Sequence, residues 1–567
     1  MKKPIKTLCT ALFAVLAIST LASCGPTDDG PGADNFLPNG TEDNPYRIVK
    51  EPVTVKIFAP HSAGNPEYKD LEMFKHLSEI TGLQFEFTTP DTSAYSTQRA
   101  NVWSNQKLLP DLFLFNNAIS EQVQYAEMNF QAYAPFNDPN YKEGHLINQY
   151  MPNYKALLEN NFGIDKSQGD AKEVVTLSDG KMYATLSVGD VARDLTYKMF
   201  INQQWIDNIN NNYGGYNDQL LPDADEIKTI EEYYTVLRAF KEYDANDNGD
   251  PNDEIPVTSK SLEYLRNFIL ASYGYVSYGP EINNTGDDYV FVPYTEAYRK
   301  YLQFTNTLWK EGLLHKDTFS ITTDSQMATT GTQNRLGSFV SAAAYLTVGY
   351  EYESNYKTFG PLTSSYYNGP ALHWGFGYFK PDGATIPQNS KKQKEVARLI
   401  DIMYTELGQQ LISYGVEGKN WEWDDAEKTS WTFKVPSDWT GNQEQYRATI
   451  TPNVGSASAL YWSNDFVGKM NDPIIKELNE MSEIYLPYLK NPEPSEVKMN
   501  STEYSTITTI KASLDPQLKY LEASLIRGDK DPFNDADYDA FITALKGYGA
   551  DNLLKCYNDA LDRYLLG

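Results

Sequence analysis

Oxygen-bearing side chains recur at alternate positions in the segment 244–254, which carries the plainest chemistry in the chain. Asp244, Asn246 and Asn248 occupy positions 1, 3 and 5 of a loop that has Gly249 at position 6, as at the start of an EF-hand loop. Carboxylate and amide oxygens are the ligands that Ca²⁺ prefers, and glycine permits the sharp turn between them. The pattern therefore predicts a bound calcium ion. The candidate ligands are Asp244, Asn246, Asn248, Asp250, Asp253 and Glu254.

The end of this loop departs from an EF-hand. Position 12 is Ile255, where an EF-hand has a glutamate that binds calcium through both oxygens, and Pro256 follows. We expect the preceding helix to begin at Thr229, with Glu232 completing a capping box, and to bring Asp244 to its C-terminal end. A loop closed by a strand lacks a second helix, so a calmodulin-like switch is not expected. An acidic, asparagine-rich turn without metal remains the alternative.

The other reactive residue types form no recognisable catalytic motif. The five histidines are scattered and lack the H-E-x-x-H spacing of a zinc site. The sequence also has no G-x-S-x-G nucleophile motif and no G-x-x-x-x-G-K-[ST] phosphate loop. Glycoside hydrolysis needs only two suitably separated carboxylates, and their separation is not readable from sequence. We predict that the protein is not an enzyme, with a glycan-degrading enzyme acting outside the cell as an alternative.

The N-terminus has the pattern of a bacterial lipoprotein signal. Lysines precede an apolar run from about Leu8 to Leu21, which ends on the lipobox-like sequence Leu-Ala-Ser-Cys24. This pattern predicts a signal peptide over 1–23, a lipidated Cys24 and a flexible tether over 24–49, where Gly, Pro and Asp are dense. The body would then lie on the extracytoplasmic face of the cell membrane, held by the lipid anchor alone. An ordinary secretory signal with an incidental cysteine is the alternative.

The composition narrows the class of partner. The chain carries 48 Lys+Arg against 76 Asp+Glu, a net charge of -28, which argues against nucleic-acid binding. It contains 42 Tyr, 25 Phe and 9 Trp, and the flat faces and polar tips of Tyr and Trp suit neutral sugar rings. Cys556 is the one cysteine left after the signal and the anchor, so no internal disulfide is expected and core burial must supply the stability.

Hydrophobic periodicity predicts an α/β fold. Residues 53–57 alternate as a strand, a helix runs from Tyr68 to Gly82, and 83–87 returns as a strand. Strand, helix and strand at this spacing form a βαβ unit, so we expect a parallel sheet. A long amphipathic helix is expected near 391–414.

Several short motifs in a fixed order resemble those of one family. The resemblance is to the extracellular solute-binding proteins of family 1, specifically the large lipoprotein branch that includes alginate-binding proteins, and it covers about residue 50 to the C-terminus. The motifs are Leu109-Pro110-Asp111, Asp179-Gly180-Lys181-Met182-Tyr183, Phe240-Lys241 leading to Asp253-Glu254-Ile255-Pro256, Trp309-Lys310-Glu311-Gly312-Leu313, Tyr414-Gly415-Val416-Glu417-Gly418-Lys419 and Asp559-Ala560-Leu561-Asp562-Arg563-Tyr564.

The resemblance implies a two-lobe, type II periplasmic-binding-protein-like fold, with hinge strands and a central ligand cleft that closes on its ligand. One lobe would comprise 50–185 plus 373–425, and the other 190–370 plus 430–567. The implied function is the lipid-anchored solute-binding component of a carbohydrate ABC transporter, a monomer that captures an oligosaccharide and delivers it to the permease. The calcium ion would be structural. A surface glycan receptor that serves no transporter is a further alternative.

The candidate ligand contacts are residues that follow predicted strands or lobe crossings, where open α/β sheets bind their ligands. Aromatic side chains would stack on sugar rings, and Asn, Asp and Arg would bond hydroxyl groups. The alternative for each position is an ordinary place in the core or on the solvated surface. The candidates are Asn116, Asn117, Asp190, Arg193, Tyr345, Trp374, Tyr461 and Trp462.

Overall fold

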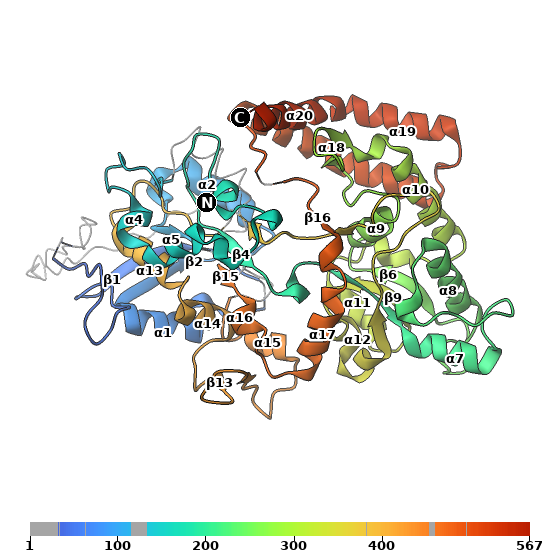
Figure 1. Ribbon diagram of the computed structural model, residues 1–567, viewed down its shortest axis with the longest axis horizontal. Coiled ribbons are helices and arrows are strands. Elements are labelled where there is room, and N and C mark those ends of the chain that lie inside the picture. Colours follow the sequence, from blue (N-terminus) through green and yellow to red (C-terminus); the bar gives the residue numbers. More distant parts are fainter. Residues whose placement is uncertain are drawn as a thin grey trace, which may run out of the picture.

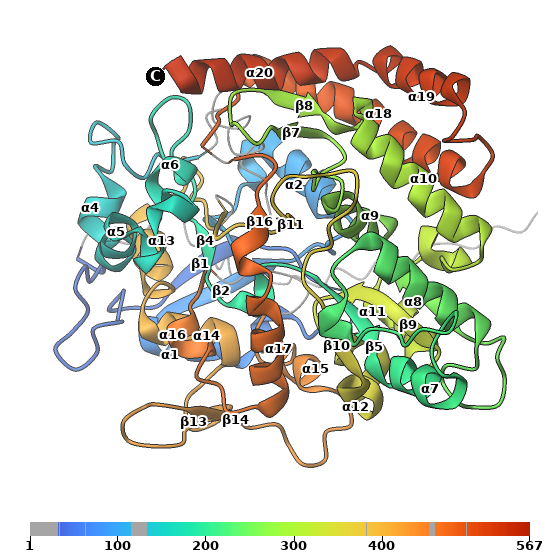
Figure 2. The same ribbon diagram turned by 45° about the vertical axis from the view of Figure 1, so that its right-hand side comes forward.

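The computed structural model describes Gly32 and residues 34–62, 64–114, 133–380, 383–452, 460–494 and 496–566. The predicted signal peptide, Cys24 and the candidate contacts Asn116 and Asn117 lie outside these residues. The described chain forms two α/β lobes that lie side by side (Figures 1 and 2), as the two-lobe prediction requires. None of the helices in the described part of the chain has the length and apolar character needed to cross a bilayer.

The first lobe is built on the predicted βαβ unit. Strand β1 (Val53–Phe58), helix α1 (Glu72–Thr81) and strand β2 (Leu83–Thr88) form it, and Gly82 ends α1 with a φ of 78°. Strand β3 (Leu112–Phe113) pairs with the other edge of β1, so the parallel sheet has the order β2-β1-β3. The helices of this lobe are α2 (Tyr95–Ser104), α4 (Leu146–Tyr150), α5 (Pro152–Glu159), α6 (Ala171–Val175), α13 (Gln393–Ile402) and α14 (Glu406–Tyr414).

Two details of this lobe differ from the sequence-based expectation. The single helix expected near 391–414 is two helices, because the Thr405 hydroxyl accepts a hydrogen bond from Gly408 N and so begins α14 anew. Part of the segment predicted as a tether over 24–49 packs against the first lobe instead. The Phe36 ring lies 5.6 Å from that of Tyr150, and Ile48 and Val49 are fully buried in the core of the lobe.

The second lobe holds a four-stranded mixed sheet in the order β10-β5-β9-β6. Its strands are β5 (Lys198–Asn202), β6 (Ile255–Ser259), β9 (Leu336–Ser341) and β10 (Tyr356–Thr358), of which β6 and β9 are parallel. The capping box predicted for Thr229 and Glu232 is present and begins helix α8. The helices are α7 (Gln203–Tyr213), α8 (Ile230–Glu242), α9 (Leu262–Ala271), α10 (Glu296–Lys310), α11 (Asp324–Gly331), α12 (Tyr345–Tyr352), α18 (Ser501–Arg527), α19 (Asp535–Gly547) and α20 (Ala550–Leu566), and β7 (Pro280–Ile282) pairs with β8 (Tyr289–Phe291).

Short strands mark the places where the chain passes between the lobes. Strand β4 (Ser187–Gly189) pairs with β12 (Phe379–Lys380) on one side and β15 (Tyr461–Trp462) on the other. Strand β11 (His373–Trp374) pairs with β16 (Leu489–Lys490). We define three crossings from these strands. The first crossing is 190–197 and the second is 375–378. The third crossing runs from Trp462 to helix α17 (Pro473–Glu483).

The third crossing lies later in the chain than the boundary near 427 expected from the resemblance. Strands β13 (Trp421–Trp423) and β14 (Trp431–Phe433), α15 (Gln443–Arg447) and α16 (Asn464–Val467) come before α17. Trp431 packs at 4.6 Å against Tyr414 of α14, and Ile450 O accepts a hydrogen bond from Met73 N of α1. These contacts hold the segment 430–452 against the first lobe.

Candidate functional site

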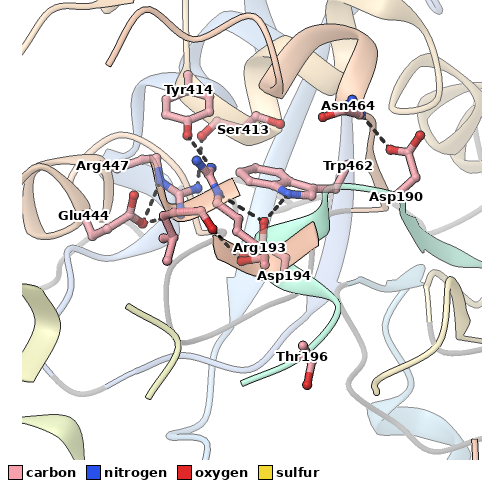
Figure 3. A network of polar contacts seen from close by, with 12 residues as sticks. Asp190, Arg193, Asp194, Thr196, Ser413, Tyr414, Glu444, Arg447, Trp462 and Asn464 are labelled. Carbon is pink, nitrogen blue, oxygen red and sulfur yellow. Dashed lines mark hydrogen bonds and ion pairs between the residues drawn. The ribbon is translucent and has the colours of Figure 1, made fainter. Parts of the chain in front are cut away.

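The aromatic pair on β15 divides between the core and the hinge. Successive side chains of a strand point to opposite faces. Tyr461 faces the first lobe, where its ring lies 5.6 Å from Phe162. Trp462 faces the crossings, where its ring stacks 6.0 Å from Tyr414 with an interplanar angle of 23°. The structure therefore places Trp462, and not Tyr461, among the polar residues of the hinge (Figure 3).

Trp462 is held on several sides. Its Nε1 donates a 2.7 Å hydrogen bond to Asp194 Oδ2. The guanidinium carbons of Arg193 and Arg447 lie 5.9 and 5.3 Å from the centre of its ring. Cation–π contacts of this kind attract the guanidinium to the electron-rich ring face. The indole is thus fixed in orientation, and it remains half-buried at the junction of the lobes.

The two arginines make most of their polar contacts within the protein, although Nη1 of Arg193 is buried without a hydrogen-bond partner. Arg193 is only 6% exposed; its Nη2 donates to Tyr414 Oη at 3.2 Å and its Nε to Asp194 at 3.4 Å. Arg447 donates to Glu444 Oε2 at 3.0 Å and to Ser413 O at 3.2 Å (Figure 3). Arg193 was a candidate to bond ligand hydroxyls. In this arrangement it supports Trp462 from within the protein.

Asp194 was missed by sequence reasoning, although it lies beside a candidate. Its side chain is 48% exposed, and one carboxylate oxygen binds both Trp462 and Arg193. The candidate Asp190 is half-buried, and its Oδ1 accepts a 2.6 Å hydrogen bond from Asn464 N of the third crossing. Burial raises the pKa of Asp190. Both carboxylates lie on the first crossing, a few residues apart.

Tyr345 brings the second lobe to the same cluster. It begins α12, is 7% exposed and stacks 5.2 Å from Tyr350. Burial, with the negative charge of Glu444 second, raises the pKa of Tyr345, and the positive charge of Arg193 opposes that rise. Helix α12 of one lobe therefore meets α15 of the other beside the hinge.

Trp374 belongs to a second aromatic group at the crossings. Its ring lies 4.5 Å from Phe376 and 6.3 Å from Tyr264, and Tyr197 lies 4.4 Å from Tyr264. Thr196 Oγ1 donates to Trp374 O at 2.6 Å. No motif marked Tyr197, Tyr264 or Phe376, because the three come from separate segments; only their places beside strand ends hint at the site.

The loop that was predicted to bind calcium brings most of its candidate ligands together. The carboxylate of Asp253 accepts hydrogen bonds from the amides of Asn246 at 3.0 Å and Asn248 at 3.1 Å. Asp244 Oδ2 accepts from Gly249 N at 2.8 Å. The carboxylate of Asp250 instead accepts a 3.1 Å hydrogen bond from the backbone N–H of Asn252.

Glu254 supplies the observation that tests whether this loop fits an ion. The residue is 5% exposed, its Oε1 accepts from Ala245 N at 3.0 Å, and its Oε2 is buried without a partner. Burial raises the pKa of Glu254. No group of three histidine, cysteine or carboxylate side chains capable of holding a metal occurs among the described residues. An ion here would need amide or backbone oxygens as well, and these hard oxygen donors fit calcium.

Two α/β lobes that are joined by three crossings among the described residues form the two-lobe binding-protein fold that was expected. No protein-family model matches the chain. The chain is 22% identical to the fructooligosaccharide ABC transporter substrate-binding protein FusA of Streptococcus pneumoniae, over 98% of each protein. It is 24% identical to lipoprotein LipO of Bacillus subtilis, over 66% of this chain and 69% of LipO.

Solved structures extend this similarity. FusA in complex with kestose, and a FusA EF-hand mutant in complex with fructo-nystose, each match with a TM-score of 0.71 and 21% identity, over 91% of this chain and 100% of theirs. Alginate-binding protein AlgQ2 without calcium ion matches with a TM-score of 0.69 and 19% identity, over 92% of this chain and 100% of AlgQ2. Identities this low show a shared fold. FusA, which is similar over nearly its whole length, is an ABC transporter substrate-binding protein, and AlgQ2 is an alginate-binding protein, which confirms the resemblance drawn from the motifs.

A buried lysine at the first crossing makes stability depend on pH. Lys198 is fully buried, its Nζ donates to Arg193 O at 2.6 Å, and burial lowers its pKa to about 7. Between pH about 7 and the ordinary lysine pKa of about 10.5, the unfolded chain keeps a proton that the folded chain has released. Lys198 therefore makes the free energy of unfolding rise with pH across this window.

We expect the free energy of unfolding, measured by urea titration, to increase more for wild type than for Lys198→Met as the pH rises from 7 to 9.5. The difference between the two proteins is the quantity to follow, because other groups titrate in both. Lys555→Met, which removes an exposed lysine, is the control and should show no such trend. Parallel curves for wild type and Lys198→Met would show that Lys198 does not titrate in this way.

Proposed function

We propose that the protein is the solute-binding component of an ABC transporter, capturing an oligosaccharide between its lobes and delivering it to the permease. The fixed orientation of Trp462 at the crossings carries the proposal. An aromatic ring that is already immobilised loses little side-chain entropy when a sugar stacks on it. The similarity to FusA, whose name and structures concern fructooligosaccharides, supports an oligosaccharide as the cargo.

The hinge suggests how binding would be coupled to closure. Trp462 and the carboxylates of Asp190 and Asp194 stand at the first and third crossings, whereas Trp374 precedes the second. A sugar that stacks on these rings and donates hydroxyl hydrogen bonds to the carboxylates would favour the closed arrangement, in which it contacts all of these groups at once. Ligand shifts an equilibrium only through its different affinity for the two states, so contacts from both lobes favour closure. The permease would then select the closed form.

The same site leaves two alternative functions to test. Carboxylates near a bound sugar could catalyse glycoside hydrolysis, but we favour binding without catalysis, because the homologues are transporter components. A glycan receptor that serves no permease would bind the same ligands. We also propose that the protein acts as a monomer.

We expect an oligosaccharide to raise the melting temperature of the mature protein in a panel of kestose, nystose, maltotriose and trigalacturonic acid. A ligand present at 100 times its dissociation constant stabilises the native state by about 2.7 kcal/mol. Trp462→Ala should lose most of this shift. Trp439→Ala, which removes an indole that is 37% exposed, is the matched control and should keep it.

Each mixture is also analysed by chromatography for sugar products. A shift with intact sugar supports a transport receptor, and release of products assigns the protein to the enzymes. No shift with any sugar refutes oligosaccharide binding as proposed.

We also propose that calcium occupies the loop 244–254 and stabilises the second lobe. The loop packs against its own lobe: Arg335 Nε lies 3.3 Å from Asp253 Oδ2, and Asn246 Nδ2 donates to Asn334 O at 3.4 Å. A cation would give the buried Oε2 of Glu254 the partner that the protein does not supply. A FusA EF-hand mutant and AlgQ2 without calcium ion are among the similar solved structures, and both support calcium binding as the role of this loop.

We expect millimolar calcium to raise the melting temperature and EDTA to lower it. Glu254→Gln should raise the calcium concentration needed for this stabilisation by about tenfold or more, because a charged oxygen ligand becomes an amide. Asp247→Asn is the control, since Asp247 is exposed and stands at a non-ligand position. An unchanged melting temperature across the titration would show that the loop is a metal-free turn.

We propose that Cys24 carries the lipid anchor, on the lipobox-like sequence and the similarity to lipoprotein LipO. The full chain expressed in a bacterial host should incorporate a labelled fatty acid and fractionate with membranes. Cys24→Ser should abolish both, whereas Cys556→Ser should abolish neither. Membrane fractionation of Cys24→Ser without label would point to a different mode of attachment.

A further inference from the structure

A small cavity lies at the carboxyl ends of the parallel strands β6 and β9, on the side of the second lobe that faces the crossings. The cavity has a volume of about 10 Å³. The carboxyl ends of parallel strands are where open α/β sheets bind ligands. The lining residues are Thr196, Tyr197, Tyr264, Asn267, Phe268, Val340, His373 and Trp374.

One of the polar groups that line this cavity is the amide of Asn267. The residue is 6% exposed, and its Oδ1 is buried without a hydrogen-bond partner. No described hydrogen bond uses its Nδ2 either. A buried amide in a folded protein nearly always has a partner, and one without a partner lowers stability. Asn267 is therefore placed to receive a polar group from outside the chain.

Aromatic rings surround the same cavity. Tyr264 and Asn267 lie three residues apart on α9, so they share one face of the helix. The ring of Tyr264 lies 4.4 Å from Tyr197 and 6.3 Å from Trp374, and each of the three rings is half-buried. A partnerless amide within a wall of aromatic faces combines the two kinds of contact that a sugar offers, an apolar ring face and a hydroxyl group.

We propose that this cavity is a subsite for one hydroxyl group of a neutral sugar, with the Asn267 amide bonding the hydroxyl and the rings of Tyr264 and Trp374 contacting the sugar. The proposal rests on the proposed function and adds the class of sugar. A space of about 10 Å³ holds a single water-sized group. A hydroxyl oxygen fits that space, whereas a carboxylate, which has two oxygens and a charge, does not. The group of the sugar that enters this space is therefore a hydroxyl and not a carboxylate.

The test separates a ligand contact from a structural role. Asn267→Leu removes the amide and keeps a side chain of similar size. Replacing an unpartnered polar group by an apolar one is expected to leave the melting temperature of the ligand-free protein unchanged or higher. The dissociation constants for kestose, nystose and maltotriose, measured by calorimetry, should rise about tenfold or more for each sugar that wild type binds. Trigalacturonic acid should bind more weakly than the neutral sugars to wild type.

Asn306→Leu is the matched control. Asn306 is fully buried in the same lobe, and its Nδ2 donates to Leu525 O at 3.1 Å and Ile526 O at 3.0 Å. This variant should show the opposite pattern, a lower melting temperature with unchanged sugar affinity.

Two results would overturn the inference alone. The first is equal affinity of wild type and Asn267→Leu for every neutral sugar, which would mean that a water molecule satisfies the amide. The second is tighter binding of trigalacturonic acid than of the neutral sugars. Failure of wild type to bind any sugar would overturn the proposed function together with this inference.

Discussion

The hydrogen bonds of the first crossing hold the three crossings together, and the rest of the site depends on them. Asp190 binds Asn464 N, Asp194 binds the Trp462 indole, and the Thr196 hydroxyl binds Trp374 O. The first crossing is thus bonded to the third crossing and to the strand that precedes the second. Because these bonds are made within a few residues, one short segment fixes both the Trp462 indole and the backbone at Trp374.

The second lobe is held together internally by a buried ion pair. In the second lobe, Arg266 and Glu522 form an ion pair that is 1% exposed on each side, with a 2.7 Å bond from Arg266 Nε. The hydroxyls of Tyr298 and Tyr301 donate to the same carboxylate at 3.1 and 2.9 Å. Removal of one partner of such a buried pair leaves an uncompensated charge, which costs about 3–5 kcal/mol. These contacts join α9, α10 and α18 within the second lobe.

Local signals allowed the fold to be predicted from sequence, and long-range packing limited the prediction of the site. The βαβ unit, the capping box at Thr229 and the helix stop at Gly82 each depend on neighbouring residues, and each is present. The third crossing could not be placed, because the contact of Trp431 with Tyr414 joins separate segments. Trp462 was found among the polar residues of the hinge. Its support by Asp194 and Arg447 depends on side-chain directions that the sequence does not contain.

The way the first crossing makes its bonds has a consequence for how this architecture could diversify. Thr196 bonds the carbonyl of Trp374 and not its indole, and Asp190 bonds the backbone N–H of Asn464 and not its amide. Substitution of the Trp374 or Asn464 side chain would therefore leave the corresponding bond intact. The side chains of Trp374 and Asn464 could therefore change while these two hinge bonds are kept, so a new cargo specificity need not disturb the hinge.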